Sequence, residues 1–174
     1  IAAAIILSCL LNVPHWARNH TQFGNILGDQ TADYHNASYW PGVILSNALR
    51  SASLHAATPW ESTNESIARS VGRTLGLAGL DADDAGTTWG GQYIISPRVL
   101  NEDYAPAPLH VLLILTAIIV TLAQPPSPQA RVLVLMVVAQ LLLFCIILKW
   151  QVWHTRLHAP MMMLGAPCVA VLLA

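Results

Sequence analysis

The chain has 174 residues, of which 55% are hydrophobic and only 10% are charged, and its formal net charge is −1. An ordinary soluble domain carries about 25% charged residues. This composition excludes a disordered chain, a coiled coil and a nucleic-acid-binding protein that relies on a basic surface. Because the chain begins at Ile1 and ends at Ala174, both inside apolar runs, the sequence predicts a fragment of a longer membrane protein.

The charged residues are concentrated in one part of the chain. All nine acidic residues and five of the eight basic residues lie within residues 14–108, which gives this 95-residue insert a net charge of −4 (nine acidic against five basic). An ionised side chain at the centre of a bilayer costs roughly 2.5–3.5 kcal/mol on insertion scales. We therefore interpret the nearly uncharged remainder as membrane-embedded and the insert as extramembrane.

The remainder contains four apolar segments, and a membrane-spanning helix needs about 20 residues. The Pro-rich stretch 124–131 is typical of a tight turn between antiparallel helices. The predicted fold class is an all-α integral membrane protein with about four transmembrane helices, the first and last truncated, and a mainly helical insert. The predicted order is the end of a span at 1–13, an extracytoplasmic insert at 14–108, a span at 109–123, a short cytoplasmic turn at 124–131, a span at 132–148, an outer loop at 149–159 and the start of a span at 160–174.

Within the insert, residues 39–57 predict a helix, because Pro41 suits a first helical turn and apolar residues follow it. A second helix is predicted to begin at Thr58 and to stop at Gly76. Its start resembles a capping box, in which Thr58 caps the helix and Glu61 follows three residues later. Residues 77–107 predict a long loop with one short strand at 92–96.

The sequence offers no strong metal or disulfide pattern. The acidic stretch 81–86 has Gln92 where an EF-hand loop requires its final Glu, so a solvated acidic turn is the favoured interpretation. His154 and His158 are four residues apart but have no third ligand near them in the sequence. The cysteines fall in apolar segments and are interpreted as buried apolar residues. No metal and no cofactor are therefore predicted.

Three stretches, taken in order, carry a resemblance to a known family. They are 14–19 (PHWARN) with 23–25 (FGN), 101–105 (NEDYA) with 108–110 (PLH), and 150–153 (WQVW) with 156–160 (RLHAP). Each lies at the predicted mouth of a span. The chain resembles bacterial polytopic membrane glycosyltransferases of the GT-C class, which include protein-mannosyltransferase-like and aminoarabinose-transferase-like proteins. The residues that depart from the family pattern are Ile26, Asn101, Pro106, Ala107 and Leu157.

The resemblance implies a multi-pass enzyme of the bacterial inner membrane that moves a sugar from a polyprenyl-phosphate donor to an acceptor at the outer face. It also implies that the catalytic base lies in an earlier outer loop, outside this chain. Membrane lipid is a further expected partner, and nucleic acid is not. The substrate-binding candidates are Arg18, Asn19, Glu102, Asp103, His110 and Arg156.

The chemistry of these residue types is compatible with the assignments but leaves alternatives open. Arg18 and Arg156 offer a permanently charged, planar fork of donors that suits a lipid phosphate, or they only anchor the chain among lipid headgroups. Glu102 and Asp103 could orient a sugar hydroxyl or transfer a proton, or form a solvated acidic pair. A transporter, a non-catalytic scaffold whose insert binds a partner, and a soluble protein with buried apolar helices are the alternative kinds of protein.

Overall fold

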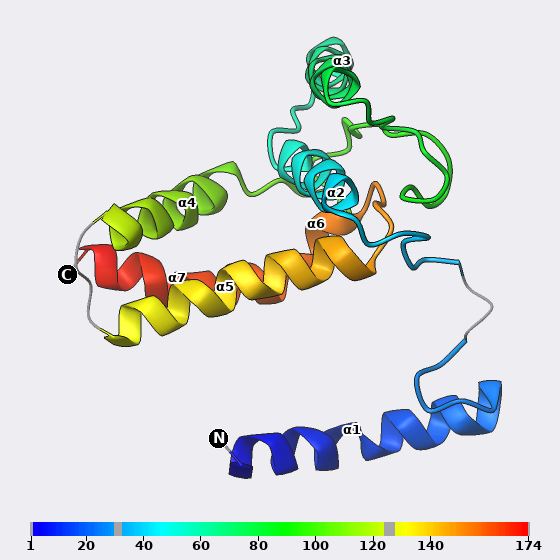
Figure 1. The fold of residues 1–174 in the computed structure, drawn as a ribbon, viewed down its shortest axis with the longest axis vertical. Coiled ribbons are helices and arrows are strands. Elements are labelled where there is room, and N and C mark those ends of the chain that lie inside the picture. Colours follow the sequence, from blue (N-terminus) through cyan, green and yellow to red (C-terminus); the bar gives the residue numbers. More distant parts are fainter. Residues whose placement is uncertain (1, 30–32, 124–127, 174) are drawn as a thin grey trace. The chain divides into compact units, whose positions relative to one another are not determined.

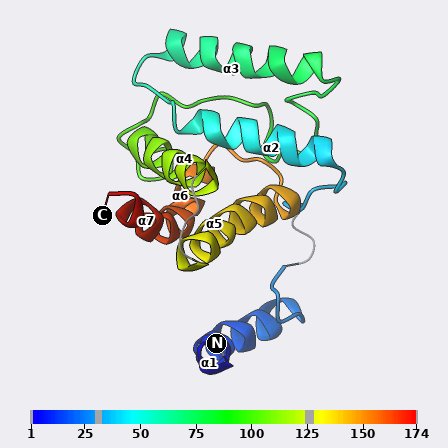
Figure 2. The ribbon, with the colours of Figure 1, turned by 60° about the vertical axis from the view of Figure 1, so that its left-hand side comes forward.

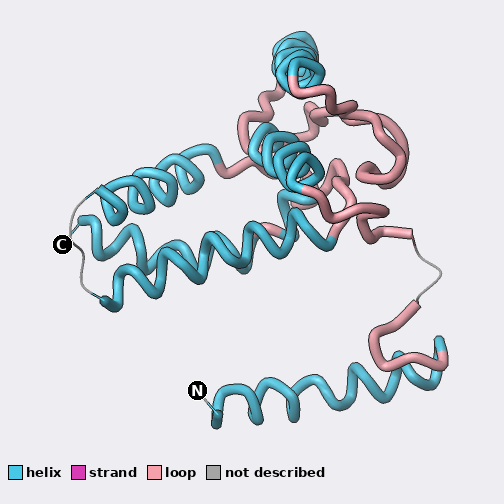
Figure 3. The backbone as a smooth tube through the Cα atoms, viewed as in Figure 1, coloured by secondary structure: helices cyan, strands magenta, loops and turns pink. Residues whose placement is uncertain are grey.

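A computed structural model describes residues 2–29, 33–123 and 128–173, and these residues form α-helices joined by loops (Figures 1 and 3). The described residues contain no strand, and only two isolated β-bridges occur among them. The seven helices are α1 (Ala2–Phe23), α2 (Pro41–Leu54), α3 (Glu61–Leu77), α4 (Pro108–Ala123), α5 (Pro128–Ile147), α6 (His154–Leu157) and α7 (Ala159–Leu173).

The chain divides into two compact units. Ile1–Tyr34 contains α1, and His35–Ala174 contains α2 to α7. In the larger unit α7 packs against both α4 and α5, and the three helices lie side by side in both ribbon views (Figures 1 and 2). Their core consists of Ile114, Ala117, Val134, Val137 and Cys168.

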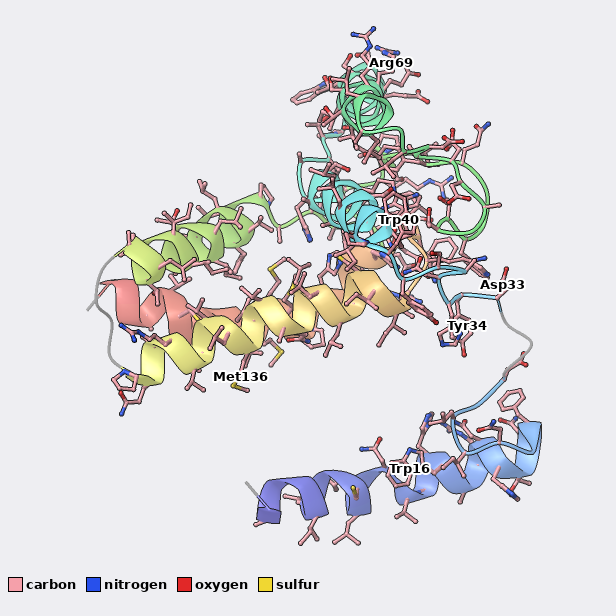
Figure 4. The ribbon with its side chains drawn as sticks, in the orientation of Figure 1. Trp16, Asp33, Tyr34, Trp40, Arg69 and Met136 are labelled. Carbon is pink, nitrogen blue, oxygen red and sulfur yellow. The ribbon has the colours of Figure 1, made fainter. Side chains whose placement is uncertain are left out.

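Two details define the packing of these three helices. Gly165 permits the close approach of α7 to α4, because a Cβ atom at this position would lie 2.5 Å from Cδ1 of Ile114. On the outer side of α5, Met136 points away from α4 and α7 (Figure 4) and is 49% exposed. The bundle is therefore held by apolar contact along one side of each helix, and apolar side chains also cover its outer surface.

The end of α5 is capped by two buried side-chain amides. A helix end leaves backbone carbonyl groups without partners inside the helix. Nδ2 of Asn36 donates to the carbonyl oxygens of Cys145 (2.9 Å) and Ile146 (2.7 Å). Nδ2 of Asn47 donates to those of Cys145 (2.9 Å) and Leu148 (3.0 Å). Because Asn47 belongs to α2, these bonds fix α2 to the end of α5, with α3 beyond it (Figure 2).

Arg50, less than one turn after Asn47, is 0% exposed. Its guanidinium donates to Oδ1 of Asn47 (2.6 Å) and to the carbonyl oxygen of Ala82 (2.6 Å). It also donates to the hydroxyl groups of Thr87 and Thr88. Burial lowers the pKa of Arg50 to about 10, so the group is still a cation at neutral pH. One buried charge thus holds the 82–88 loop against α2.

The prediction of four transmembrane helices is wrong. Among the described residues, only α5 is long and apolar enough to cross a membrane. At about 1.5 Å per residue, its 20 residues extend about 30 Å, whereas the 16 residues of α4 extend only about 24 Å. A hydrocarbon core is about 30 Å thick. The predicted span 1–13 is the first part of α1, which continues through Pro14 into a polar half that ends at Phe23.

The predictions for the insert have mixed outcomes. The first predicted helix is confirmed as α2, which has Pro41 as its first residue. The second forms as α3, but it begins at Glu61 and has no side-chain cap, so the capping box is wrong. The side chain of Asn64 instead accepts from the N–H of Thr58 and donates to the carbonyl of Thr58, each at 2.8 Å. These two hydrogen bonds hold the backbone of Thr58, just before α3, against the first turn of the helix.

Two other predicted elements differ or fall outside the description. Residues 92–96 do not form a strand, because no neighbouring segment pairs with them. In the predicted turn 124–131, residues 124–127 lie outside the described residues and 128–131 form the first turn of α5.

Replacing Arg50 with Met should destabilise the fold by about 3–5 kcal/mol, the usual cost of removing one partner from a buried charged network. The carbonyl oxygen of Ala82 and the amide oxygen of Asn47 would lose a buried donor. The measurement is unfolding by denaturant in a fixed detergent. Arg73→Met on the exposed surface of α3 is the control and should change the free energy of unfolding by less than about 0.5 kcal/mol. Equal effects of the two changes would contradict the assigned role of Arg50.

Candidate functional site

Three segments meet at a buried junction beside the end of α2. They are His55, which follows α2, the loop that carries Asp103 and Ala107, and α6 with His158 after it. The hydroxyl of Thr155 donates to the carbonyl oxygen of Asp103 (2.8 Å), and the N–H of Ala107 donates to Nδ1 of His55 (3.2 Å). The first bond joins the stretch 101–105 to Thr155, which lies between 150–153 and 156–160 of the third stretch that carries the family resemblance.

The hydrogen bonds at His55 define the protonation of two imidazole rings. Since Nδ1 of His55 accepts from Ala107, the neutral ring carries its proton on Nε2. Nε2 of His55 lies 2.9 Å from Nδ1 of His158, so His55 is the donor in this bond. His158 then carries its proton on Nε2, and this buried N–H has no partner within the described residues. The junction therefore presents one unused hydrogen-bond donor.

Burial keeps the histidines of this junction neutral. Desolvation lowers the pKa of His55 to about 4 and the pKa values of His154 and His158 to about 3. The charge of Arg50 lowers the pKa of His154 further, and the backbone of Lys149 partly opposes this shift. At neutral pH the three histidines of the junction are consequently uncharged hydrogen-bonding groups. No group of His, Cys, Asp and Glu side chains in the described chain is arranged to hold a metal ion.

An apolar cavity of about 120 Å³ opens beside the junction, between α2, α4, α5 and α7. Its polar lining is limited to Ser51, His55 and His158. The Ser51 hydroxyl is also buried without a partner among the described residues. An apolar cavity of about 150 Å³ can hold a benzene ring, so this cavity has room for a five-carbon apolar group. The other lining residues are Ala48, Ala52, Val111, Ile114, Leu115, Ile118, Val137, Val138, Leu141, Met161 and Met162.

Two predicted site residues, Asp103 and Arg156, form an ion pair at this junction. Nη1 of Arg156 donates to Oδ1 of Asp103 at 2.6 Å. The side chain of Arg156 is 54% exposed and that of Asp103 is 36% exposed. The other guanidinium N–H groups of Arg156 have no partner in the described part of the chain. Because Arg156 lies two residues before His158, the ion pair and the cavity share one short segment.

The structure does not join the remaining predicted site residues to this pair. Glu102 is exposed, and His110 is exposed in the first turn of α4. Arg18 and Asn19 belong to the unit Ile1–Tyr34 and lie within α1, not in a loop after a span. Asn19 is 8% exposed, and its amide donates to the carbonyl oxygen of Ile26 (3.2 Å), which closes the turn after α1.

Sequence reasoning missed the polar residues of the cavity. The spacing of His154 and His158, next to Arg156, is a signal that could have pointed to His158. No local signal indicates His55, which lies 103 residues from His158 in the chain. Ser51 looks like one of several small residues on a predicted helix, and only the packing of four helices around it gives it a place in the site.

No protein-family model, curated protein or solved structure matches this chain. The resemblance to membrane glycosyltransferases therefore rests on the three sequence stretches alone.

The free energy of unfolding should fall as the pH is lowered from 7 to 5. Each buried histidine has a pKa near 6.5 in the unfolded chain and near 3–4 in the fold, so the unfolded state takes up more protons in this window. Each histidine then contributes a slope of up to about 1.4 kcal/mol per pH unit below pH 6.5.

The variant His154→Phe keeps an aromatic ring against Phe144, whose ring centre lies 4.6 Å from that of His154. It should remove about one third of the pH-dependent loss of stability, because one of three titrating groups is gone. Denaturant unfolding at pH 7, 6 and 5 in one detergent measures both slopes. Identical slopes for the parent and the variant would show that His154 is not a titrating group of the fold.

Proposed function

We propose that this chain is part of a membrane glycosyltransferase that moves a sugar from a polyprenyl-phosphate donor to an acceptor at the outer face of the membrane. The observation that carries the proposal is the ion pair of Arg156 and Asp103 beside an apolar cavity. A lipid-linked donor combines an anionic phosphate with a long apolar chain, and the site offers a separate contact to each part. The family-like stretches contain both residues of the pair.

Arg156 supplies the contact to the phosphate. A guanidinium stays charged and can donate two parallel N–H bonds to phosphate oxygens. Asp103 engages Nη1 and holds the planar group in one orientation. Since the carboxylate also offsets much of the local positive charge, recognition depends on the geometry of the fork more than on net charge. Lysine cannot reproduce that geometry.

The cavity supplies the contact to the hydrocarbon chain. A five-carbon isoprene unit is close to benzene in size, and one unit can enter this open cavity. The rest of the chain would lie along apolar side chains that α4 and α5 expose, among them Leu112, Leu115 and Leu135. Burial of apolar surface contributes about 25 cal/mol per Å², so even one enclosed unit helps to hold the donor. The free N–H of His158 offers a neutral donor to an oxygen near the start of the chain.

The change Arg156→Ala should reduce transfer from a polyprenyl-phosphate sugar by about ten- to a hundredfold. A hydrogen bond to a charged group contributes roughly 1.5–3 kcal/mol, and about 1.4 kcal/mol corresponds to a factor of ten. Arg156→Lys should restore only part of the activity. The assay measures sugar transfer by the complete protein in its membrane.

The matched control for this experiment is Arg73→Ala, which removes an exposed arginine from α3 and should leave transfer unchanged. If Arg156→Ala is expressed normally and transfers sugar at the parental rate, Arg156 does not bind the donor phosphate and only anchors the chain among lipid headgroups. A parent protein that transfers no sugar from any polyprenyl phosphate, but still associates with membranes, would favour the scaffold alternative.

Filling the cavity should weaken donor binding without touching the phosphate contact. Ala48→Leu adds aliphatic atoms to the cavity wall on α2, and Ala56→Leu adds the same atoms at an exposed position just after α2. Photo-crosslinking with a polyprenyl phosphate that carries a reactive group in its chain should fall several-fold for the first variant and stay constant for the second. Equal labelling of the two variants would exclude the cavity as the chain site.

A further inference from the structure

The segment 93–98 forms one wall of an open groove of about 600 Å³, and one face of α3 forms the other wall. In the first three residues of this segment burial alternates: Tyr93 is 8% exposed, Ile94 53% and Ile95 6%. An alternation with a period of two is the mark of an extended strand. Residues 93–95 therefore have the burial pattern of a strand, although no other described segment pairs with them.

One backbone edge of this segment is unoccupied. In an extended chain, the N–H and C=O groups of one residue point to one edge and those of the next residue point to the opposite edge. The N–H of Tyr93 donates to Oδ1 of Asp83 (2.6 Å), so one edge faces the 81–86 turn. Ile94 and Ser96 then direct their backbone groups to the other edge. Within the described residues, no hydrogen bond reaches the backbone N–H or C=O of Ile94 or Ser96.

The groove runs along this free edge. Residues 93–97 line it without interruption, although side chains of successive residues in a strand point to opposite faces. Because buried residues of the segment and their exposed neighbours both line the groove, the backbone between them borders it. The opposite wall is formed by residues that share one face of α3, and the small side chain of Ala68 among them leaves room beside the edge. These residues are Glu61, Glu65, Ala68 and Arg69.

We propose that the groove binds an extended polypeptide segment, which pairs with the backbone of Ile94 and Ser96 as an added strand. A peptide is the ligand class whose donors and acceptors repeat at strand spacing. At about 3.3 Å per residue, residues 93–97 match four or five peptide residues. The inference is independent of the sugar donor proposed above.

The charges of the groove favour a peptide with side chains of both signs. Glu65 and Arg69 already form an ion pair at 3.3 Å. Glu61 and Arg98 also line the groove, and neither has an ion-pair partner among the described residues. An acidic and a basic position on one peptide would satisfy both, whereas a lipid phosphate or other anion would leave Glu61 opposed by a like charge.

The test uses a synthetic library of capped eight-residue peptides, in which threonine alternates with randomised positions, and the complete protein in detergent. The best binders are measured by fluorescence anisotropy. Ser96→Pro removes one N–H from the free edge and should weaken binding at least tenfold. Ser96→Ala keeps that N–H and should bind as the parent does. Methylation of alternate backbone nitrogens of the peptide should abolish binding, because it blocks the edge that pairs.

Hydrogen exchange gives a second readout, since peptide binding should slow exchange of the Ile94 and Ser96 amides and leave those of α3 unchanged. A library without any binder tighter than about 1 mM would overturn the proposal. So would a binder that tolerates both Ser96→Pro and backbone methylation, or that leaves the two amides unprotected. If Ser96→Pro does not fold, the methylated peptide and the exchange measurement still decide the outcome with the parent protein.

Discussion

The larger unit depends on a cation that has no access to water. Arg50 is fully buried, and a buried charge is tolerated only if hydrogen bonds replace its hydration. The oxygens that do so come from Ser46 and Asn47 on the same helix and from the 82–88 loop. Asn47 also caps α5 through its amide nitrogen. One side chain thus accepts from the buried cation and donates to the helix end, which couples the polar loop of the insert to the apolar bundle.

Both candidate binding surfaces, the apolar cavity and the groove along 93–98, depend on α2. Ser51 lines the apolar cavity, whereas the hydroxyl of Ser53 lies 2.6 Å from that of Tyr93, at the start of the groove segment. Residues two apart on an α-helix point about 200° from each other, so the two serines serve opposite faces of α2. Tyr93 also packs edge-on against Trp150, with ring centres 5.0 Å apart. The apolar cavity and the groove are consequently on opposite faces of α2, and both contact residues of the same network.

At the histidine junction, the buried hydrogen-bonding groups are neutral. His55 and His158 exchange one hydrogen bond in an environment that disfavours charge, and an N–H and a hydroxyl are left over beside an apolar cavity. Unused donors in apolar surroundings are costly unless a ligand or water meets them. The exposed pair of Arg156 and Asp103 has the opposite character, because it is charged and open. We propose for this site an amphipathic ligand, whose anionic group contacts the exposed pair and whose apolar chain enters the cavity.

The sequence by itself determined the helical class, the place of α2 with Pro41 at its start, and the apolar character of α4, α5 and α7, because these follow from local residue preferences and composition. It also singled out Asp103 and Arg156 through a motif. It did not determine how far each helix runs, and a difference of four residues separates α5, which is long and apolar enough to cross a membrane, from the shorter α4. Nor did it determine which distant groups meet. The bonds between His55 and His158 and between Arg50 and the 82–88 loop, and the missing partner of residues 93–97, depend on how helices pack, and packing is decided by contacts between residues far apart in the chain.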